Sequence, residues 1–331
     1  MKIEPQDLVD DVQSDELASA AEVCHFVLGP DLAGQRLDKA LATLMPDHSR
    51  GRIQSWIESG FVSVNDTTQT KVRLVVSAGD EVSVHVQPSE QLLAYEPDDV
   101  EFDVIAQTDQ WLVLDKQVGL VVHPGAGNWR KTLLNGLLYR YPASAQIARA
   151  GIVHRLDKDT TGLMVVAKTQ TAQTQLVRQL QERLVKREYC ALVHGWVAPQ
   201  ESTVDRPIGR DPRVPVRMSV TPTGLAKPAL THIKRLRTGT LDGLPVSEVR
   251  CRLETGRTHQ IRVHLSSIKH PLVGDTLYGG RCVGGASRQM LHARHLSFID
   301  PDSQQWVAFD SPTPEDMQAV LQRVCWRSGD H

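Results

Sequence analysis

The segment GIVHRLDKDTTGLMVVAKT, residues 151–169, is the most informative part of the sequence about the fold. Two runs rich in apolar and β-branched residues flank a polar turn ending at Gly162, so we expect HRLDKDTTG on a loop between strands. Reactive side chains concentrate on loops carried by a rigid sheet. Asp157 and Asp159 are the acidic candidates here, although an aspartate in such a loop more often accepts backbone hydrogen bonds in a turn.

The chain beyond residue 101 carries mainly strand patterns. These are WLVLDK (111–116), GLVVHP (119–124), KREYCALVHGWV (186–197), THIKRLR (231–237), VSEVRCRLE (246–254) and LHARHLSFI (291–299). Apolar residues spaced by three and four predict helices at 133–141, 171–184, 258–268 and 314–325. The patterns predict an α+β domain over 101–331, built on a mixed, mainly antiparallel β-sheet with flanking helices.

A smaller unit is predicted over residues 25–88. It has helical patterns in RLDKALATLM and RIQSWIESG, with Ser49 as the N-cap of the second helix and Gly60 at its end. The alternating runs FVSVN and DEVSVHV predict a small sheet. Residues 1–24 are expected to be a disordered acidic tail, and residues 89–100 a linker.

Charge is unevenly distributed along the 331 residues, whose formal net charge is -2. Residues 1–22 hold one lysine and seven acidic residues, whereas residues 205–300 hold 16 Arg or Lys and 7 Asp or Glu. Such a basic segment is either a solvated surface or a field that attracts a phosphate backbone. Five scattered cysteines without a CxxC pair, and no secretory signal or 20-residue apolar segment, favour a cytoplasmic protein.

The segment HRLDKDTTGLMVVAKT resembles the signature of the RluA-type pseudouridine synthases, and most closely that of their D-type branch. Further blocks follow in the order typical of that family, and the resemblance covers nearly the whole chain beyond residue 25. They are VHPGAG (122–127), KREYCALVHG (186–195), RPIGRDPR (206–213), TGRTHQIRVH (255–264) and HPLVGDTLYGG (270–280). The unit at 25–88 is similar to the S4 RNA-binding domain. The resemblance implies the pseudouridine synthase fold and the isomerisation of uridine in large-subunit (23S) ribosomal RNA.

The resemblance implies that Asp157 is the catalytic carboxylate, Arg262 its partner and Tyr189 the side chain that stacks on uracil. The chemistry fits, because the detached base rejoins the same sugar and one carboxylate suffices, whereas a glycosidase generally needs two. Asp157 must be ionised, and a permanently charged arginine is a suitable partner. From the residues alone, Arg262 would more readily be a solvent-facing helix residue and Tyr189 a packed strand residue.

The candidate RNA contacts are more weakly indicated. By resemblance Arg155 fills the space of a flipped base, and it could otherwise contact a phosphate or pair with Asp159. His259 either contacts RNA or supports the loop. The cationic candidates of the small unit are Arg36, Arg50, Arg52 and Lys71.

No cofactor and no metal site are predicted. DKDTTG resembles the start of a calcium loop, but position twelve is Lys168 instead of a bidentate glutamate. The expected partner is ribosomal RNA or an assembling large subunit, with no membrane, and a monomer would suffice. Three alternatives remain: the C-type branch with other target uridines, an S4-containing RNA-binding protein without catalysis, and another RNA modifier such as a methyltransferase. The last lacks a strand-linked glycine loop for its cofactor.

Overall fold

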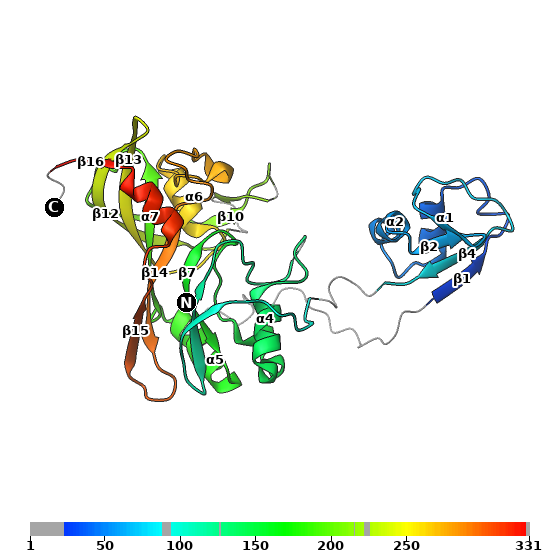
Figure 1. Cartoon of the computed structure of the whole chain (residues 1–331), viewed down its shortest axis with the longest axis horizontal. Helices are drawn as coiled ribbons and strands as arrows, with labels where there is room; N and C mark the ends of the chain where they lie inside the picture. Colours follow the sequence, from blue (N-terminus) through cyan, green and yellow to red (C-terminus); the bar gives the residue numbers. More distant parts are fainter. Residues whose placement is uncertain (1–22, 88–93, 126, 215, 222–225, 329–331) are drawn as a thin grey trace. The chain divides into compact units, whose positions relative to one another are not determined.

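The structure is a computed structural model that describes residues 23–87, 94–125, 127–214, 216–221 and 226–328. The chain forms two compact units, residues 1–90 and residues 91–331 (Figure 1). The predicted acidic tail lies outside the described residues except for Val23 and Cys24, which belong to the first strand of the small unit. Among the described residues, no helix is long and apolar enough to cross a membrane.

The small unit packs two helices against a four-stranded antiparallel sheet. Its elements are β1 (Val23–Val27), α1 (Leu37–Leu44), α2 (Arg50–Glu58), β2 (Val62–Val64), β3 (Thr67–Gln69) and β4 (Glu81–His85), and the strand order is β1-β4-β2-β3. Helix α2 begins as predicted, because the Ser49 hydroxyl accepts a hydrogen bond from the Arg52 amide. Gly60 follows this helix with φ +78°, a left-handed conformation that favours glycine.

The large unit is built on one ten-stranded sheet. Its strands are β5 (Asp103–Gln107), β6 (Trp111–Lys116), β7 (Thr161–Ala167), β8 (Lys186–His194), β9 (Glu201–Asp205), β12 (Leu230–Leu241), β13 (Leu244–Leu253), β14 (Leu291–Ile299), β15 (Trp306–Asp310) and β16 (Cys325–Trp326). The order is β16-β12-β13-β8-β14-β7-β6-β5, with β15 paired to β14 and β9 paired to β12. Among these pairings β14 runs parallel to β7, and the others are antiparallel. This confirms the predicted mixed, mainly antiparallel sheet.

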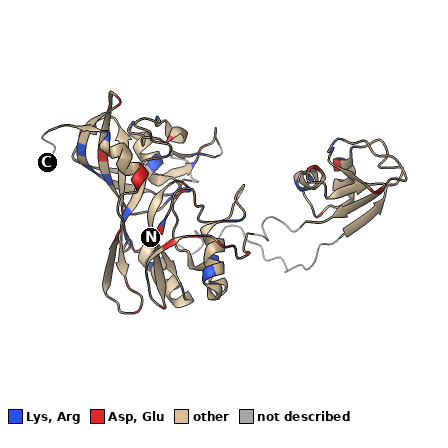
Figure 2. Cartoon of the chain, viewed as in Figure 1, with Lys and Arg blue, Asp and Glu red and all other residues tan. Residues whose placement is uncertain are grey.

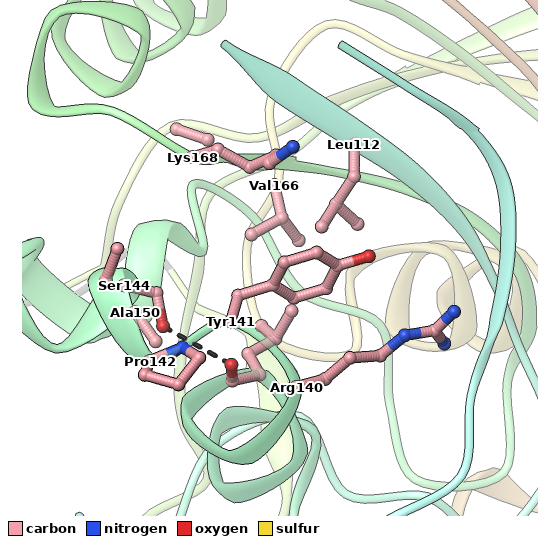
Figure 3. A pocket seen from close by; sticks show the side chains of 11 residues that line it. Leu112, Arg140, Tyr141, Pro142, Ser144, Ala150, Val166 and Lys168 are labelled. Atoms are coloured by element: carbon pink, nitrogen blue, oxygen red, sulfur yellow. Dashed lines mark hydrogen bonds between the residues drawn. The ribbon is translucent and has the colours of Figure 1, made fainter. Parts of the chain in front are cut away.

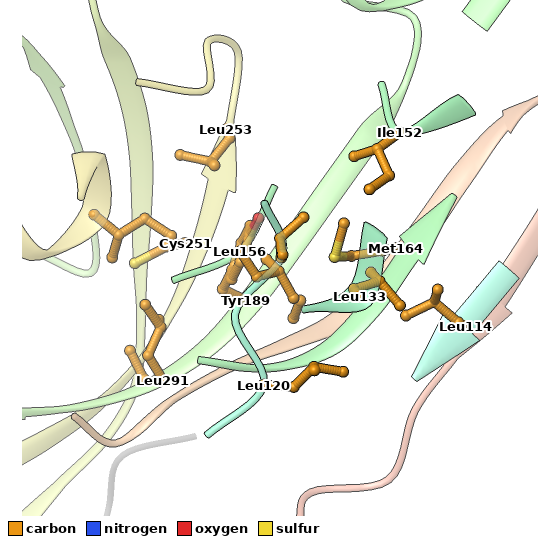
Figure 4. Packing of buried hydrophobic residues seen from close by; sticks show 14 of the residues in the cluster. Leu114, Leu120, Leu133, Ile152, Leu156, Met164, Tyr189, Cys251, Leu253 and Leu291 are labelled. Atoms are coloured by element: carbon orange, nitrogen blue, oxygen red, sulfur yellow. The ribbon is translucent and has the colours of Figure 1, made fainter. Parts of the chain in front are cut away.

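Among the described residues, four α-helices, short 3-10 turns and a small two-stranded sheet complete the large unit. They are α4 (Leu133–Arg140), α5 (Gln170–Gln181), α6 (Gln260–Ser267), α7 (Glu315–Gln322), the 3-10 turns at Pro142–Gln146, Ala148–Gly151 and Thr276–Tyr278, and the strands β10 (Ile208–Arg210) and β11 (Met218–Val220). All four helices lie where the apolar spacing predicts them. The main apolar cluster joins side chains of β6, β7, β8, β13 and α4 (Figure 4).

Two predicted boundaries differ from the structure. The apolar run GLVVHP at 119–124 is irregular and not a strand, because the carbonyls of Val121 and Val122 accept hydrogen bonds from the start of α4. The predicted linker also ends early: the Asn135 side-chain amide donates to the carbonyls of Ala94 and Glu96. The segment from residue 94 onward is therefore held against the large unit.

Candidate active site

The loop that carries Asp157 is held through its backbone carbonyls. The carbonyl of Asp157 accepts from the Thr160 amide, and that of Asp159 accepts from Arg288 Nη1 at 2.9 Å. The Lys158 carbonyl accepts from the Gly119 amide and from Lys116 Nζ. A loop in which three successive carbonyls are hydrogen-bonded has few alternative conformations. Asp157 is therefore presented on a loop that is fixed to the rest of the sheet.

Lys116 on β6 also holds this loop in position through hydrogen bonds. Its side chain is fully buried, and Nζ donates to the carbonyls of Gln117, Leu120 and Lys158 at 2.8–3.0 Å. Burial lowers the pKa of Lys116 to about 7, while the charges of Asp159 and Asp157 oppose that effect. Three acceptors match the three donors of an ammonium group, so this lysine satisfies carbonyls that no regular strand partner reaches.

The loop ends earlier than the sequence suggests, since β7 begins at Thr161 and includes Gly162. Gly162 has φ +113°, and a Cβ placed there would lie 2.3 Å from the Ala293 carbonyl oxygen. This close approach accompanies the parallel pairing of β7 with β14. Glycine is required at this position because a side chain would separate the two strands immediately after the Asp157 loop.

Arg262 on α6 lies between two carboxylates. Its Nη1 donates to Asp157 Oδ2 at 3.1 Å, and its Nε and Nη2 donate to the two oxygens of Asp275 at 2.7 and 2.9 Å. Burial acts to lower the pKa of Arg262, but the hydrogen bonds and charges of Asp275 and Asp157 outweigh it and raise the pKa. The structure thus brings together the predicted aspartate and arginine, which lie 105 residues apart in the sequence.

The expectation from helical spacing that Arg262 faces solvent is wrong. Helix α6 is buried from Gln260 to Leu265, and the Arg262 side chain is 9 % exposed. The helix lies between strands and the 270–280 segment, so its polar stripe also meets protein: Ser266, one turn after Arg262, donates its hydroxyl proton to the Tyr278 carbonyl at 2.8 Å. A polar stripe on a helix therefore does not identify a solvent face when a second polar layer covers it.

Of the two carboxylates that bind Arg262, that of Asp157 is the more accessible to solvent. Its side chain is 17 % exposed, whereas that of Asp275 is 1 % exposed and both its oxygens bind Arg262. One oxygen of Asp157 lies 3.9 Å from Nε2 of His259. A single reachable carboxylate beside a guanidinium suits a reaction in which no external nucleophile takes part.

His259 is held in an unusual backbone conformation with a defined ring orientation. It precedes α6 with φ +56° and ψ +21°, in the left-handed region, and its Nδ1 lies 2.7 Å from the hydroxyl oxygen of Tyr278. That oxygen also accepts from the Met218 amide at 3.0 Å. Because the amide occupies the oxygen as an acceptor, the Tyr278 proton is free to be donated to Nδ1, which leaves the His259 proton on Nε2, facing Asp157.

Tyr189 on β8 belongs to the main apolar cluster together with Leu156 and Cys251 (Figure 4). It is 5 % exposed, and burial raises the pKa of its hydroxyl to about 12, with Arg187 opposing and Asp157 adding to the shift. Because the charge of Asp157 affects the Tyr189 hydroxyl, these two side chains lie close enough to interact electrostatically. The hydroxyl is thus a neutral group and not a phenolate at ordinary pH.

Arg155 is exposed and makes no hydrogen bond or ion pair within the described ranges, so the alternative pairing with Asp159 is absent there. Its charge lowers the pKa of His123 and of His259, after the larger effect of burial in each case. Arg155 therefore stands beside these histidines with its guanidinium available to a ligand.

The candidates of the small unit differ in their surroundings. Arg36 and Arg50 both bind the buried carboxylate of Asp38, through Nε of Arg36 at 3.0 Å and Nη2 of Arg50 at 2.7 Å. Arg52 donates to the Gln87 carbonyl and lies 5.1 Å from the Trp56 ring. Lys71 is exposed. The side chains of Arg36 and Arg50 remain 39 % and 47 % exposed. Although both bind Asp38, each therefore keeps an exposed part that a phosphate could contact.

The basic segment predicted over 205–300 is partly neutralised in the fold. Figure 2 shows Lys and Arg positions along β12 and β13, with acidic positions among them. The pairs are Lys234 with Glu201, Arg237 with Glu248, and Arg250 with Glu188. Positive and negative side chains therefore alternate on this part of the surface, which does not carry a uniform positive charge.

A separate cavity of about 240 Å³ lies at the other end of β7. Arg140, Tyr141 and Lys168 line it together with Leu112 and Val166 (Figure 3). Lys168 directly follows the last residue of β7, whereas Asp157 precedes its first. Seven strand residues span roughly 20 Å, so this cavity is distinct from the Asp157 site.

Two residues of the site were missed from the sequence. Asp275 and Tyr278 both lie in HPLVGDTLYGG, a block that the resemblance singles out without a role for either. Only their contacts with Arg262 and His259 reveal what they do. Within the ranges that the structure describes, no group of three His, Cys, Asp or Glu is arranged to hold a metal ion.

Both units of the chain are similar to known proteins. The RNA pseudouridylate synthase family matches residues 110–267, and the S4 domain matches residues 35–82. Ribosomal large subunit pseudouridine synthase D of Neisseria meningitidis serogroup B is 48 % identical, covering 92 % of this chain and 84 % of that protein. The protein of the same name from Nitrosomonas europaea is 48 % identical, covering 89 % and 86 %.

A solved structure, human RNA pseudouridylate synthase domain containing 1, shares 29 % identity with a TM-score of 0.54, covering 73 % of this chain and 92 % of that one. The predicted resemblance and the S4 unit are thereby confirmed, and the alternatives of a methyltransferase and of a binding protein without catalysis lose their basis. With its Asp157–Arg262 pair, its fold and these relatives, the chain belongs to the RNA pseudouridylate synthase family and is an RNA pseudouridine synthase.

Proposed function

We propose that this enzyme converts specific uridines of large-subunit (23S) ribosomal RNA to pseudouridine, several of them in one stem-loop. The hydrogen bond of Arg262 to Asp157 carries the proposal, because it sets a permanently charged guanidinium against the more accessible of the two carboxylates that Arg262 binds. The printed names of the most similar relatives, ribosomal large subunit pseudouridine synthase D, support the class of RNA. The alternative is the same chemistry at other ribosomal uridines, as in the C-type branch.

The chemistry begins with cleavage of the bond between ribose C1′ and uracil N1, and the bonding pair goes to uracil. Asp157 either attacks C1′ to form a covalent adduct or stabilises the positive sugar and removes the 2′-proton to give a glycal. In the first route C5 of the turned base attacks C1′ and breaks the bond to Asp157. In the second route C5 bonds to C1′ of the glycal while the proton held by Asp157 returns to C2′. In both routes C5 then loses its proton, and uracil N1, which kept the bonding pair, gains one. Both routes need an ionised Asp157, which Arg262 stabilises by charge and by a direct hydrogen bond.

The detached uracil needs a surface that holds it without fixing its orientation. Tyr189 offers an aromatic face, on which a base can stack in more than one orientation. Because its hydroxyl has a pKa of about 12, it is protonated at neutral pH and accepts the C5 proton poorly, so its main contribution is stacking. The target base must first leave the helix. Arg155, which is exposed and has no ion-pair partner among the described residues, would occupy the vacated position.

The S4 unit supplies additional RNA contacts through Arg36, Arg50, Arg52 and Lys71, and His259 contributes at the active site. We also propose that the enzyme acts in the cytoplasm, as a monomer and without a cofactor. All five cysteines lie within the described part of the chain and are free thiols, which is consistent with a reducing compartment.

Purified protein incubated with in vitro transcribed large-subunit ribosomal RNA, in the absence of any cofactor, tests the function. Pseudouridine should appear at a few defined positions, and mapping them distinguishes the D-type from the C-type targets. Asp157→Asn should retain RNA binding and lose essentially all turnover. Absence of product with the unchanged protein, or substantial turnover with Asp157→Asn, would contradict the proposal.

A further inference from the structure

Arg187 is a buried cation with no counter-ion among the residues that the structure describes. It lies on β8 and is 8 % exposed, yet within the described parts of the chain its guanidinium makes no hydrogen bond and no ion pair. Its Nε atom is completely covered and has no partner. Arginines so deeply buried normally bind a carboxylate, because several kcal/mol of hydration are lost on burial. The fold therefore holds a guanidinium whose hydrogen-bonding capacity is unused.

The neighbourhood of Arg187 is that of the active site. Tyr189 lies two residues further along the same strand, and side chains two apart on a strand point to the same side. Burial lowers the pKa of Arg187, an effect opposed by Tyr189 and Glu254. Glu254 does not neutralise it, because that carboxylate is within 3.3 Å of His232 and 3.6 Å of Arg252.

The loop before α6 lies against the tip of Arg187. A Cβ placed on Gly256 would lie 2.7 Å from Arg187 Nη1. Gly256 is three residues before His259, whose Nε2 faces Asp157. His154, which precedes the Asp157 loop, is also close enough for the charge of Arg187 to lower its pKa, after the larger effect of burial. The guanidinium is thus surrounded by segments that carry Tyr189, His259 and Asp157.

We infer that Arg187 is an anion-binding residue of the active site, whose counter-ion is an oxygen of the bound RNA. This inference rests on the proposed RNA substrate. A guanidinium fork binds such oxygens through two parallel hydrogen bonds, and the small exposed part of the side chain is the surface they reach. The anionic oxygen comes from one of two sources: a phosphate next to the target nucleotide, or the uracil, which carries the bonding pair after N1 leaves the sugar.

The test replaces Arg187 with methionine, which has similar reach and no charge. Removing an unpaired buried charge should leave the thermal midpoint unchanged or raise it. RNA function should nevertheless fall. Arg250→Met is the matched control, because Arg250 lies on the neighbouring strand β13, is 44 % exposed and already pairs with Glu188. The control should lose less than twofold in affinity and rate.

Two measurements distinguish the sources of the oxygen. Dissociation constants for large-subunit ribosomal RNA are compared in an Asp157→Asn background, and single-turnover rates are compared with Asp157 intact. A phosphate contact predicts about 10- to 100-fold weaker binding and a salt dependence reduced by roughly 0.7 in log-log slope. A contact with uracil predicts unchanged binding and a rate about 10²- to 10³-fold slower.

Gly256→Ala provides a second variant that keeps the charge. Its backbone is not in the left-handed region, so alanine is tolerated there, and the added methyl group displaces the guanidinium. It should reproduce the Arg187→Met defect in a weaker form. The inference is overturned if Arg187→Met keeps both affinity and rate, if it lowers the thermal midpoint well below that of Arg250→Met, or if Gly256→Ala behaves as the unchanged protein.

These outcomes are separable from a failure of the proposed function. If the unchanged protein forms no pseudouridine in this RNA, the proposed substrate is wrong. The binding comparison in the Asp157→Asn background then still tests the phosphate contact, whereas the contact with uracil is tested by the rate on an RNA that the unchanged protein does modify.

Discussion

Asp275→Asn tests how far catalysis depends on the residue that orients Arg262. In the structure Asp275 accepts two hydrogen bonds from Arg262, at 2.7 and 2.9 Å, and its side chain is 1 % exposed. Asparagine keeps the shape but offers one oxygen, and its amide group faces a guanidinium nitrogen that also donates. One charged hydrogen bond is therefore lost, which costs about 1.5–3 kcal/mol.

The lost hydrogen bond should lower the turnover rate. The Arg262 guanidinium must move to separate its N–H group from the new amide N–H group at position 275. Its single bond to Asp157, at 3.1 Å, is the longest of its three contacts with carboxylates and the first to break. A loss of 1.5–3 kcal/mol corresponds to a rate lowered by roughly 10- to 150-fold. KM should change little, since Asp275 is covered and does not reach the RNA.

The assay is single-turnover conversion of uridine in ribosomal RNA, with RNA affinity measured in parallel. Asp242→Asn is the control, because Asp242 also pairs with an arginine, Arg323 at 3.4 Å, but is 46 % exposed. If Asp275→Asn keeps the rate of the unchanged protein while remaining folded, Asp275 does not position Arg262. A large rise in KM at constant kcat would place Asp275 in substrate binding instead.

Three further predictions concern the histidines and the small unit. Burial lowers the pKa of His154 from 6.5 to about 3, so between these values the unfolded chain binds a proton that the folded chain does not, and stability falls as pH decreases. The stability advantage of the unchanged protein over His154→Gln in urea unfolding should shrink by about 2 kcal/mol from pH 7 to pH 5, and an advantage independent of pH would refute this. Tyr278→Phe should shift the proton of His259 toward Nδ1, detectable in ¹⁵N–¹H spectra of the ring, and an unchanged tautomer would refute the assignment. Deleting residues 1–88 should weaken RNA affinity while leaving measurable turnover, and complete loss of turnover in a folded fragment would show that the S4 unit does more than bind RNA.

The sequence predicts the regular elements of this chain well because their signals are local. Ser49 as the N-cap of α2 and the helix over 133–141 follow from spacing and capping alone. GLVVHP was predicted as a strand and is irregular, although Leu120 and Val122 are buried as their apolar character suggests. Short apolar runs report burial, whereas the hydrogen bonds that fix their conformation come from α4, which follows later in the chain.

The residues of the active site differ in the same way: some are recognisable from the sequence, and others only from their contacts in the structure. Asp157 lies on a motif of consecutive residues and is recognisable, but its pairing with Arg262 and the second carboxylate, Asp275, depend on contacts between distant segments. Spacing along α6 misassigned Arg262 to a solvent face because the 270–280 segment that covers it carries no regular period. Arg187 gave no signal in the sequence, since the absence of a partner is visible only once every neighbour is placed.

The geometry explains how a loop residue reaches the precision that chemistry demands. A strand would fix Asp157 firmly but would pair its backbone and restrict access, whereas a free loop would expose it without fixing it. Here the loop is unpaired with any strand, yet Lys116 and Arg288 reach its carbonyls from β6 and from the segment before β14. Two buried basic side chains thus replace the missing ladder, while Arg155 and Lys158 of the loop stay exposed. Substituting either cation should therefore lower the rate of an enzyme that still binds its RNA, because the loop would lose its position before the protein loses its surface.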